Sequence, residues 1–136
     1  MNASDYFEHD ADIGVIGRGP TMETAFESAA RALFAIMAPA GSVRGARSVT
    51  VVFEESDPEI ALVTWLNRLL ATARLEGLVL GSFQLRRDSD CWRGSATGEP
   101  WRADIERGVE VKGATLTGLS VQETGDGWEA RCVVDV

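Results

Sequence analysis

The stretch "TMETAFESAARALFAIMAPAG", Thr21 to Gly41, carries the clearest structural signal in the chain and decides which folds are available to it. Its apolar side chains recur at spacings of three and four residues, which places them on one face of an α-helix. These side chains are Met22, Ala25, Phe26, Ala29, Leu33, Ile36 and Met37. Thr21 is a suitable N-cap, and Pro39 and Gly41 end the helix. The stretch therefore predicts an amphipathic helix that buries one face against another layer.

A second helix is predicted within "SDPEIALVTWLNRLLATARLEG", residues 56–77. Ser56 and Glu59 have the spacing of a capping box, and Gly77 is suited to end the helix. The side chains expected to face inward are Leu62, Leu66, Leu69, Leu70 and Ala73. The preceding stretch "SVTVVFE", residues 48–54, alternates and is rich in β-branched residues, which predicts a strand.

The rest of the chain has the patterns of strands and turns. Before the first helix, "YFEHDADIGVIGRG", residues 6–19, predicts one strand followed by a glycine-rich loop. Four strand-like segments follow the second helix, at residues 78–87, 91–99, 109–123 and 127–136, and the loop "TGDG" joins the last two as a hairpin. The order β-α-β-α-β-β-β-β predicts an α+β fold in which two helices pack on one mixed or antiparallel sheet.

Composition and charge narrow the class of protein. The 136 residues, 45% of them hydrophobic, suit a single domain spanning residues 1–136. We expect a cytoplasmic protein without membrane association, because no apolar run approaches the roughly 20 residues that cross a bilayer and no secretory signal is present. Cys91 and Cys132 are expected to be free thiols. The net charge of −8 provides no basic footprint for tight nucleic-acid binding and favours a cation or a basic protein partner.

Acidic residues beside the only histidine are the most suggestive chemical feature. In an extended strand Asp10 and Asp12 share one face, and His9 points to the other. Carboxylate oxygens suit Mg²⁺, Mn²⁺ or Ca²⁺ better than zinc. Asp135 in the final strand, with the carbonyl or terminal carboxylate of Val136, could supply further oxygens. Solvated carboxylates at a strand end are the alternative, because most surface aspartates have no specific role.

Catalytic motifs find little support in the chain. His9 is the only imidazole, and no serine or cysteine lies on a recognisable nucleophile elbow. Cysteine and histidine are too few for a structural zinc site. The spacing of Gly14, Gly17 and Gly19 does not match a phosphate-binding loop. These observations weigh against an enzyme.

The chain nevertheless resembles a known family. "HDADIG", residues 9–14, is similar to the His-x-Ala-Asp-Ile-Gly opening of archease, a small accessory protein of the RtcB-type RNA ligase. The resemblance continues in the same order through residues 21–37, 62–80, 108–115 and 128–136. It implies a non-catalytic activator that promotes the metal- and GTP-dependent guanylylation and multiple turnover of the ligase in tRNA splicing or RNA repair. The partner would be the ligase, and tRNA would be contacted only through it.

The resemblance also implies a site for a divalent cation, Ca²⁺, Mg²⁺ or Mn²⁺, held by Asp12, Asp135 and Val136. His9, Asp10 and Lys112 would support this site or contact the partner. The chain departs from the family at "KGATLT", residues 112–117, where the family often reads Lys-Ala-Val-Thr-Tyr-His. Leu116 and Thr117 thus replace a tyrosine and a histidine, so any contact made by those side chains in the family is in doubt here.

Two other functions remain open from the sequence. One is a small metal-dependent hydrolase, with Asp10 and Asp12 as ligands and His9 as general base. The other is a chaperone-like module that modulates an RNA-modifying enzyme. Hydrolysis of simple phosphoesters would favour the first, and binding to a methyltransferase rather than a ligase would favour the second.

Overall fold

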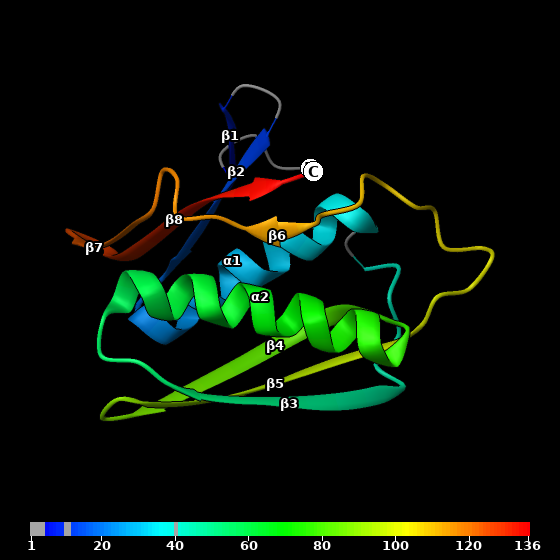
Figure 1. The fold of residues 1–136 in the computed structure, drawn as a ribbon, viewed down its shortest axis with the longest axis horizontal. Helices are drawn as coiled ribbons and strands as arrows, with labels where there is room; N and C mark the ends of the chain where they lie inside the picture. Colours follow the sequence, from blue (N-terminus) through cyan, green and yellow to red (C-terminus); the bar gives the residue numbers. More distant parts are fainter. Residues whose placement is uncertain (1–4, 10–11, 40) are drawn as a thin grey trace.

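Two helices lie between two antiparallel sheets in the computed structural model, which describes residues 5–9, 12–39 and 41–136 (Figure 1). The larger sheet has the order β1-β2-β8-β6, and β7 also pairs with β8. Its strands are β1 (Tyr6–His9), β2 (Asp12–Gly19), β6 (Gly113–Ala114), β7 (Ser120–Thr124) and β8 (Gly127–Asp135). The smaller sheet has the order β3-β5-β4, formed by β3 (Arg47–Glu54), β4 (Leu78–Asp88) and β5 (Cys91–Pro100). The middle layer consists of α1 (Met22–Met37) and α2 (Pro58–Glu76).

The α+β class is confirmed, but the single expected sheet is two sheets. The reason lies in α1, which contacts β2 and β8 of one sheet and β4 of the other. Its buried residues lie on more than one face, and alanines make up half of them: Ala25, Phe26, Ala29, Ala30, Ala32, Leu33, Phe34 and Ile36. Small side chains let a second layer approach the helix closely. No helix in the described part of the chain is both long and apolar enough to span a membrane.

The predicted N-terminal strand and loop form a hairpin instead. β1 pairs with β2, and the glycine-rich segment is strand throughout, because Gly14, Gly17 and Gly19 all lie in β2. These glycines allow close approach rather than a turn. A Cβ atom at Gly17 would lie 2.1 Å from the carbonyl oxygen of Ala25 in α1, and one at Gly14 would lie 2.1 Å from the ring of Phe7. The sequence alone does not distinguish these two uses of glycine.

The helix ends follow local chemistry, with one correction. Thr21 is the N-cap of α1, as predicted, and its hydroxyl accepts the N–H of Thr24 at 3.1 Å. The N-cap of α2 is Asp57 rather than Ser56, so the predicted capping box is wrong. The Asp57 carboxylate accepts the N–H groups of Glu59 and Ile60, and a carboxylate at this position also favours the positive end of the helix dipole. Gly77 ends the helix at φ 68°, as predicted.

The strand predicted over residues 109–123 exists only as β6 and β7. Before β6 the chain runs irregularly past the C-terminal end of α1. There the N–H groups of Gly108 and Val109 donate to the carbonyls of Met37 and Ile36 at 2.8 and 3.0 Å. These groups therefore cap a helix instead of joining a sheet. The predicted hairpin after β7 is confirmed, with Thr124 opposite Gly127.

Aromatic rings connect the middle layer to the smaller sheet. Trp92 is fully buried, with its ring stacked against Phe26 at 5.1 Å and Phe53 at 5.9 Å between centroids. Its indole N–H donates to the carbonyl of Glu55 at 3.0 Å. Trp65, also fully buried, donates to the carbonyl of Phe26 at 3.1 Å. Each indole thus contributes apolar area without leaving its N–H unpaired.

Glu99 is the one buried charged side chain among the described residues. Hydrogen bonds from the Arg102 guanidinium at 2.6 Å and from the Arg44 N–H lower the pKa of Glu99 to about 2. Arg102 also donates to the carbonyl of Ser42 at 3.2 Å. These contacts join the segment that follows β5 to the segment that precedes β3.

We predict that Gly17→Ala destabilises the protein, because the added methyl group would press the backbone of α1 away from β2. Forcing extra volume into a packed interior costs about 1–3 kcal/mol. Gly125→Ala is the matched control, since an added Cβ there has no neighbour within 4 Å and should change the free energy of unfolding by less than about 0.5 kcal/mol. Urea denaturation measures both variants, and equal stability of the two would contradict the close approach at Gly17.

Candidate metal centre

The antiparallel pairing of β2 with β8 places the beginning of β2 beside the end of β8 (Figure 1). Ile13 lies opposite Val134. Asp12 precedes Ile13 and Asp135 follows Val134, so the two aspartates occupy the next positions at the same end of the sheet. The structure therefore places the two aspartates that the sequence selects at neighbouring backbone positions of paired strands.

β6 adds a third strand at this end of the sheet. Gly113 lies opposite Asp135, and the N–H of Lys112 donates to the carbonyl of Asp135 at 2.8 Å. Lys112, the only lysine in the chain, is thereby placed next to Asp135 along the sheet. Val136 is half-buried and packs against the main core. Four of the six predicted site residues thus lie within one group of strand ends.

The electrostatics of these strand ends suit a cation. Asp135 is exposed and Asp12 is half-buried, and neither carboxylate has a hydrogen bond or ion pair with another described side chain. Two like charges at neighbouring positions of paired strands repel each other unless something neutralises them. An oxygen donor set fits Ca²⁺, Mg²⁺ or Mn²⁺.

The donor set contributed by the described residues is small. They contain no group of three or more His, Cys, Asp or Glu side chains positioned to hold a metal ion. Two carboxylates and the oxygens of Val136 would leave most of a six- to eight-oxygen calcium shell to water or to another molecule. The arrangement therefore suits an open site at the surface rather than a closed structural one.

His9 and Asp10 are placed differently from the expectation. The chain turns between β1 and β2, and His9 lies opposite Asp12 in the hairpin. The alternation expected of one continuous strand, with Asp10 and Asp12 on a common face, does not apply across this turn. Asp10 lies outside the described residues. The backbone nevertheless puts His9 beside the strand end that carries Asp12.

The departure from the family pattern lies next to β8. Leu116 is 66% exposed and Thr117 is also exposed. The carbonyl of Thr117 accepts the N–H of Val133 at 3.2 Å, and Thr115 contacts the carbonyl of Val133 through both its N–H and its hydroxyl. The backbone of this loop is thus hydrogen-bonded to β8, while the Leu116 side chain extends into solvent. Leu116 follows Lys112 by four residues in the sequence.

Two side chains of α2 hold the edge of the sheet that carries Lys112. The Asn67 side chain both donates to the carbonyl of Ala114, at 3.1 Å, and accepts its N–H, at 2.8 Å. The Arg74 guanidinium donates to the carbonyls of Val111 and Lys112, at 2.5 and 2.7 Å. β6 is only two residues long, and the Asn67 amide takes the place of a further strand on its outer edge.

Sequence analysis missed Asn67 and Arg74 as positioning residues. A polar residue seven positions before a basic one puts both on the same face of a helix, beside the apolar stripe. That spacing was the available signal, but solvent-facing residues produce the same pattern. Only the position of β6 shows that these side chains meet backbone groups.

Comparison with known proteins gives first the class of the fold. The solution structure of Methanobacterium thermoautotrophicum protein 1598 superposes with a TM-score of 0.78 at 27% identity and 97% coverage of both chains. The crystal structure of an archease and possible chaperone from Thermotoga maritima gives a TM-score of 0.67. It covers 96% of this chain and 94% of that one, and at 19% identity it speaks only to the fold. The chain therefore shares its fold, two helices between two antiparallel sheets, with these two solved structures.

Sequence comparison then gives the family. The pattern of the Archease protein family matches residues 5–136. The Protein archease of Pyrococcus furiosus is 33% identical over the whole of both chains, and that of Methanosarcina acetivorans is 32% identical over 97% of this chain and 94% of its own. The chain belongs to the archease family, which confirms the resemblance.

We predict that Asn67→Leu loosens the edge of the sheet. It keeps a side chain of similar size but leaves the N–H and carbonyl of Ala114 without partners, which costs about 1–3 kcal/mol for partly buried groups. Hydrogen exchange should become faster at the Ala114 amide. Arg68→Leu, an exposed neighbour on α2, is the control and should leave that amide unchanged. Unchanged exchange in Asn67→Leu would show that α2 does not hold β6.

Proposed function

We propose that this chain is a non-catalytic activator of an RtcB-type RNA ligase, which accelerates the metal- and GTP-dependent guanylylation of the ligase and permits multiple turnover. Membership of the archease family supports this function. The observation that carries it is the meeting of Asp12 and Asp135 at one exposed sheet end, next to Lys112. A sheet end with two carboxylates that have no partner among the described side chains is suited to hold a divalent cation while leaving coordination positions open.

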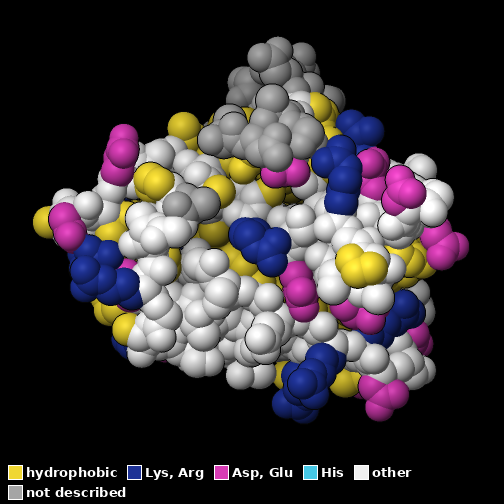
Figure 2. All heavy atoms as spheres, turned by 180° about the vertical axis from the view of Figure 1, so that it is seen from behind, with side chains coloured by type: hydrophobic (Ala, Val, Ile, Leu, Met, Phe, Trp, Pro, Cys, Tyr) yellow, Lys and Arg dark blue, Asp and Glu magenta, His cyan; other side chains and the backbone are white. Residues whose placement is uncertain are grey.

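The charge of the surface fits a protein partner better than RNA. The chain has 21 acidic and 13 basic residues, and its net charge of −8 opposes contact with phosphates. On the face seen in Figure 2, Lys and Arg side chains occur as separate groups among Asp and Glu rather than as one stripe. We infer that tRNA is reached only through the ligase, and that the acidic surface contributes to association with a more basic protein.

The cation would lie at the sheet end that carries Asp12 and Asp135, and this end would face the ligase. Ca²⁺ takes six to eight oxygen ligands, and Mg²⁺ usually keeps several waters. Asp12, Asp135 and a main-chain oxygen of Val136 would contribute part of such a shell, and Lys112 would limit the negative charge around it. A bound cation would neutralise the repulsion between the two aspartates and fix the strand ends in the arrangement that the ligase meets.

A chaperone-like action on an RNA-modifying enzyme is the second candidate. It is kept because one solved structure of the same fold, from Thermotoga maritima, is described as an archease and possible chaperone. The two candidates differ in what changes in the partner. An activator raises the rate of guanylylation of a ligase that is already soluble, whereas a chaperone raises the amount of soluble partner.

The function is tested by incubating the cognate ligase with labelled GTP and Mn²⁺, with and without this protein. We expect faster guanylylation with the protein at equal concentrations of soluble ligase, and no RNA joining by the protein alone. Soluble ligase is quantified by centrifugation in the same samples. Equal guanylylation rates would refute the activator, and a rate that merely follows soluble ligase would favour the chaperone.

The metal centre is tested separately by Asp12→Asn and Asp135→Asn, which keep side-chain size and remove one charge each. Each should weaken cation binding by about tenfold or more, because the remaining ligands no longer balance the charge of the ion. Stability without metal should not fall, since each change removes a repulsive charge. Glu123→Gln, on exposed β7, is the control. Calorimetric titration with Ca²⁺, Mg²⁺ and Mn²⁺ measures affinity, and wild-type affinity in both aspartate variants would exclude this centre.

A further inference from the structure

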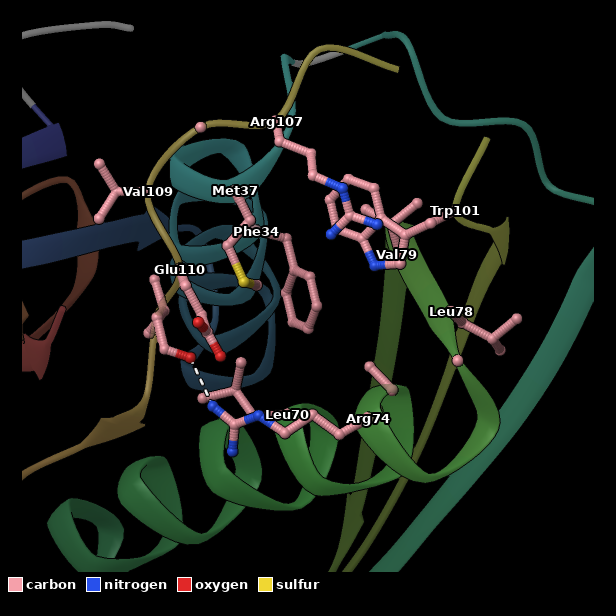
Figure 3. Close-up of a pocket in the computed structure, with 14 residues that line it drawn as sticks. Phe34, Met37, Leu70, Arg74, Leu78, Val79, Trp101, Arg107, Val109 and Glu110 are labelled. Carbon is pink, nitrogen blue, oxygen red and sulfur yellow. Dashed lines mark hydrogen bonds between the residues drawn. The ribbon is translucent and has the colours of Figure 1, made fainter. Parts of the chain in front are cut away.

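A cavity of about 390 Å³ lies between the C-terminal ends of the two helices and the segment that connects β5 to β6 (Figure 3). Its volume falls in the range of small-molecule sites. Buried side chains from different elements form its apolar surface: Phe34, Leu70, Leu78, Val79 and Val111. None of Asp12, Asp135 or Val136 lines it, so it is separate from the candidate metal centre.

Two guanidinium groups stand at opposite walls of this cavity. The Arg107 guanidinium lies over the Trp101 ring at 3.9 Å from its centroid, and Arg74 extends from α2 on the other side (Figure 3). Neither arginine forms an ion pair with a carboxylate in the part of the chain that the structure describes. Among the described residues that line the cavity, Glu110 is the only acidic one. The cavity thus has a local excess of positive charge in a chain whose net charge is −8.

The wall that carries Arg107 is held in place without a ligand. The N–H groups of Gly108 and Val109 donate to carbonyls at the end of α1, at 2.8 and 3.0 Å. A Cβ atom at Gly108 would lie 2.1 Å from the carbonyl oxygen of Ile36, so the segment is packed directly on the helix end. These bonds also satisfy carbonyls whose partial negative charge would otherwise disfavour an anion nearby. A preformed wall lowers the entropy cost of binding.

We propose that this cavity binds a small organic anion with an apolar, aromatic body. The planar body would lie against the apolar surface formed by α1, α2 and β4. The carboxylate or sulfonate group would pair with the Arg107 guanidinium, whose donor geometry matches such groups and whose stacking on Trp101 limits its motion. The negative charge of Glu110 repels the anion and lowers the affinity of the site for it.

The probe for this site is anilinonaphthalene sulfonate, an aromatic monoanion whose fluorescence rises in apolar surroundings. N-phenylnaphthylamine has the same rings without the charge and serves as the neutral comparison. We expect saturable binding at one site, with the anion bound about tenfold more tightly than the neutral compound, as one charge-assisted pair would give. Equal affinity of the two compounds would overturn the assignment of the site to anions.

Two variants with opposite effects locate the site. Arg107→Gln, at a residue with no hydrogen bond to the rest of the described chain, should weaken anion binding about fivefold or more and leave the neutral compound unaffected. Glu110→Gln should tighten anion binding. The reverse pattern, weaker binding in Glu110→Gln and tighter in Arg107→Gln, would show a cation site instead. Arg93→Gln, on the outer face of the smaller sheet, should change nothing.

A direct readout comes from the indole N–H resonance of Trp101, assigned by comparison with Trp101→Phe. The chemical shift of this resonance should change during the titration, and the change should give the same dissociation constant as the fluorescence. The resonances of buried Trp65 and Trp92 should move little. A saturable fluorescence change with an unmoved Trp101 resonance would place the dye elsewhere and refute the proposal. Thermal unfolding of each variant confirms that it is folded. No ligase is present, so the outcome is independent of the activator function.

Discussion

The antiparallel pairing of β2 with β8 is the interaction on which the larger sheet and the candidate metal centre both depend. It runs from Ile13 opposite Val134 to Gly19 opposite Trp128, and it joins the second strand of the chain to its last strand. β1 attaches to one side of this pair, and β6 and β7 attach to the other. Without it, Asp12 and Asp135 would have no common location.

A close contact between β2 and α1 supports this pairing on the face of the sheet that covers the helix. Gly17 meets the backbone of α1 at Ala25 and Ala29, where any side chain would intrude. The other side of α1 meets the smaller sheet, and Phe26 stacks on the fully buried Trp92. Because α1 packs against both sheets, it fixes their positions relative to each other. The strand ends that carry Asp12 and Asp135 therefore belong to a sheet that is packed on a helix.

α2 holds residues 111–112, the segment that lies between the cavity and the candidate metal centre. Arg74 bonds to the carbonyls of Val111 and Lys112, and Lys112 in turn bonds through its N–H to Asp135. A continuous series of hydrogen bonds therefore runs from the cavity wall to the strand end with the exposed carboxylate. The two proposed sites share this segment while using different side chains, so each can be altered without removing the other.

The sequence by itself determined the helices, most of the strands and the α+β class, because periodicity and capping depend on residues a few positions apart. Thr21 and Gly77 end their helices as their local chemistry predicts. Sequence motifs and the family resemblance also point to Asp12 and Asp135 as metal ligands, and this assignment stays a prediction. Only the tertiary structure decided that Gly17 allows a close approach and that the strands divide between two sheets. It also decided that Asn67 holds β6 and that Arg74 holds the two residues before it. These features depend on contacts between residues far apart in the chain, and no local pattern specifies which distant group a side chain will meet.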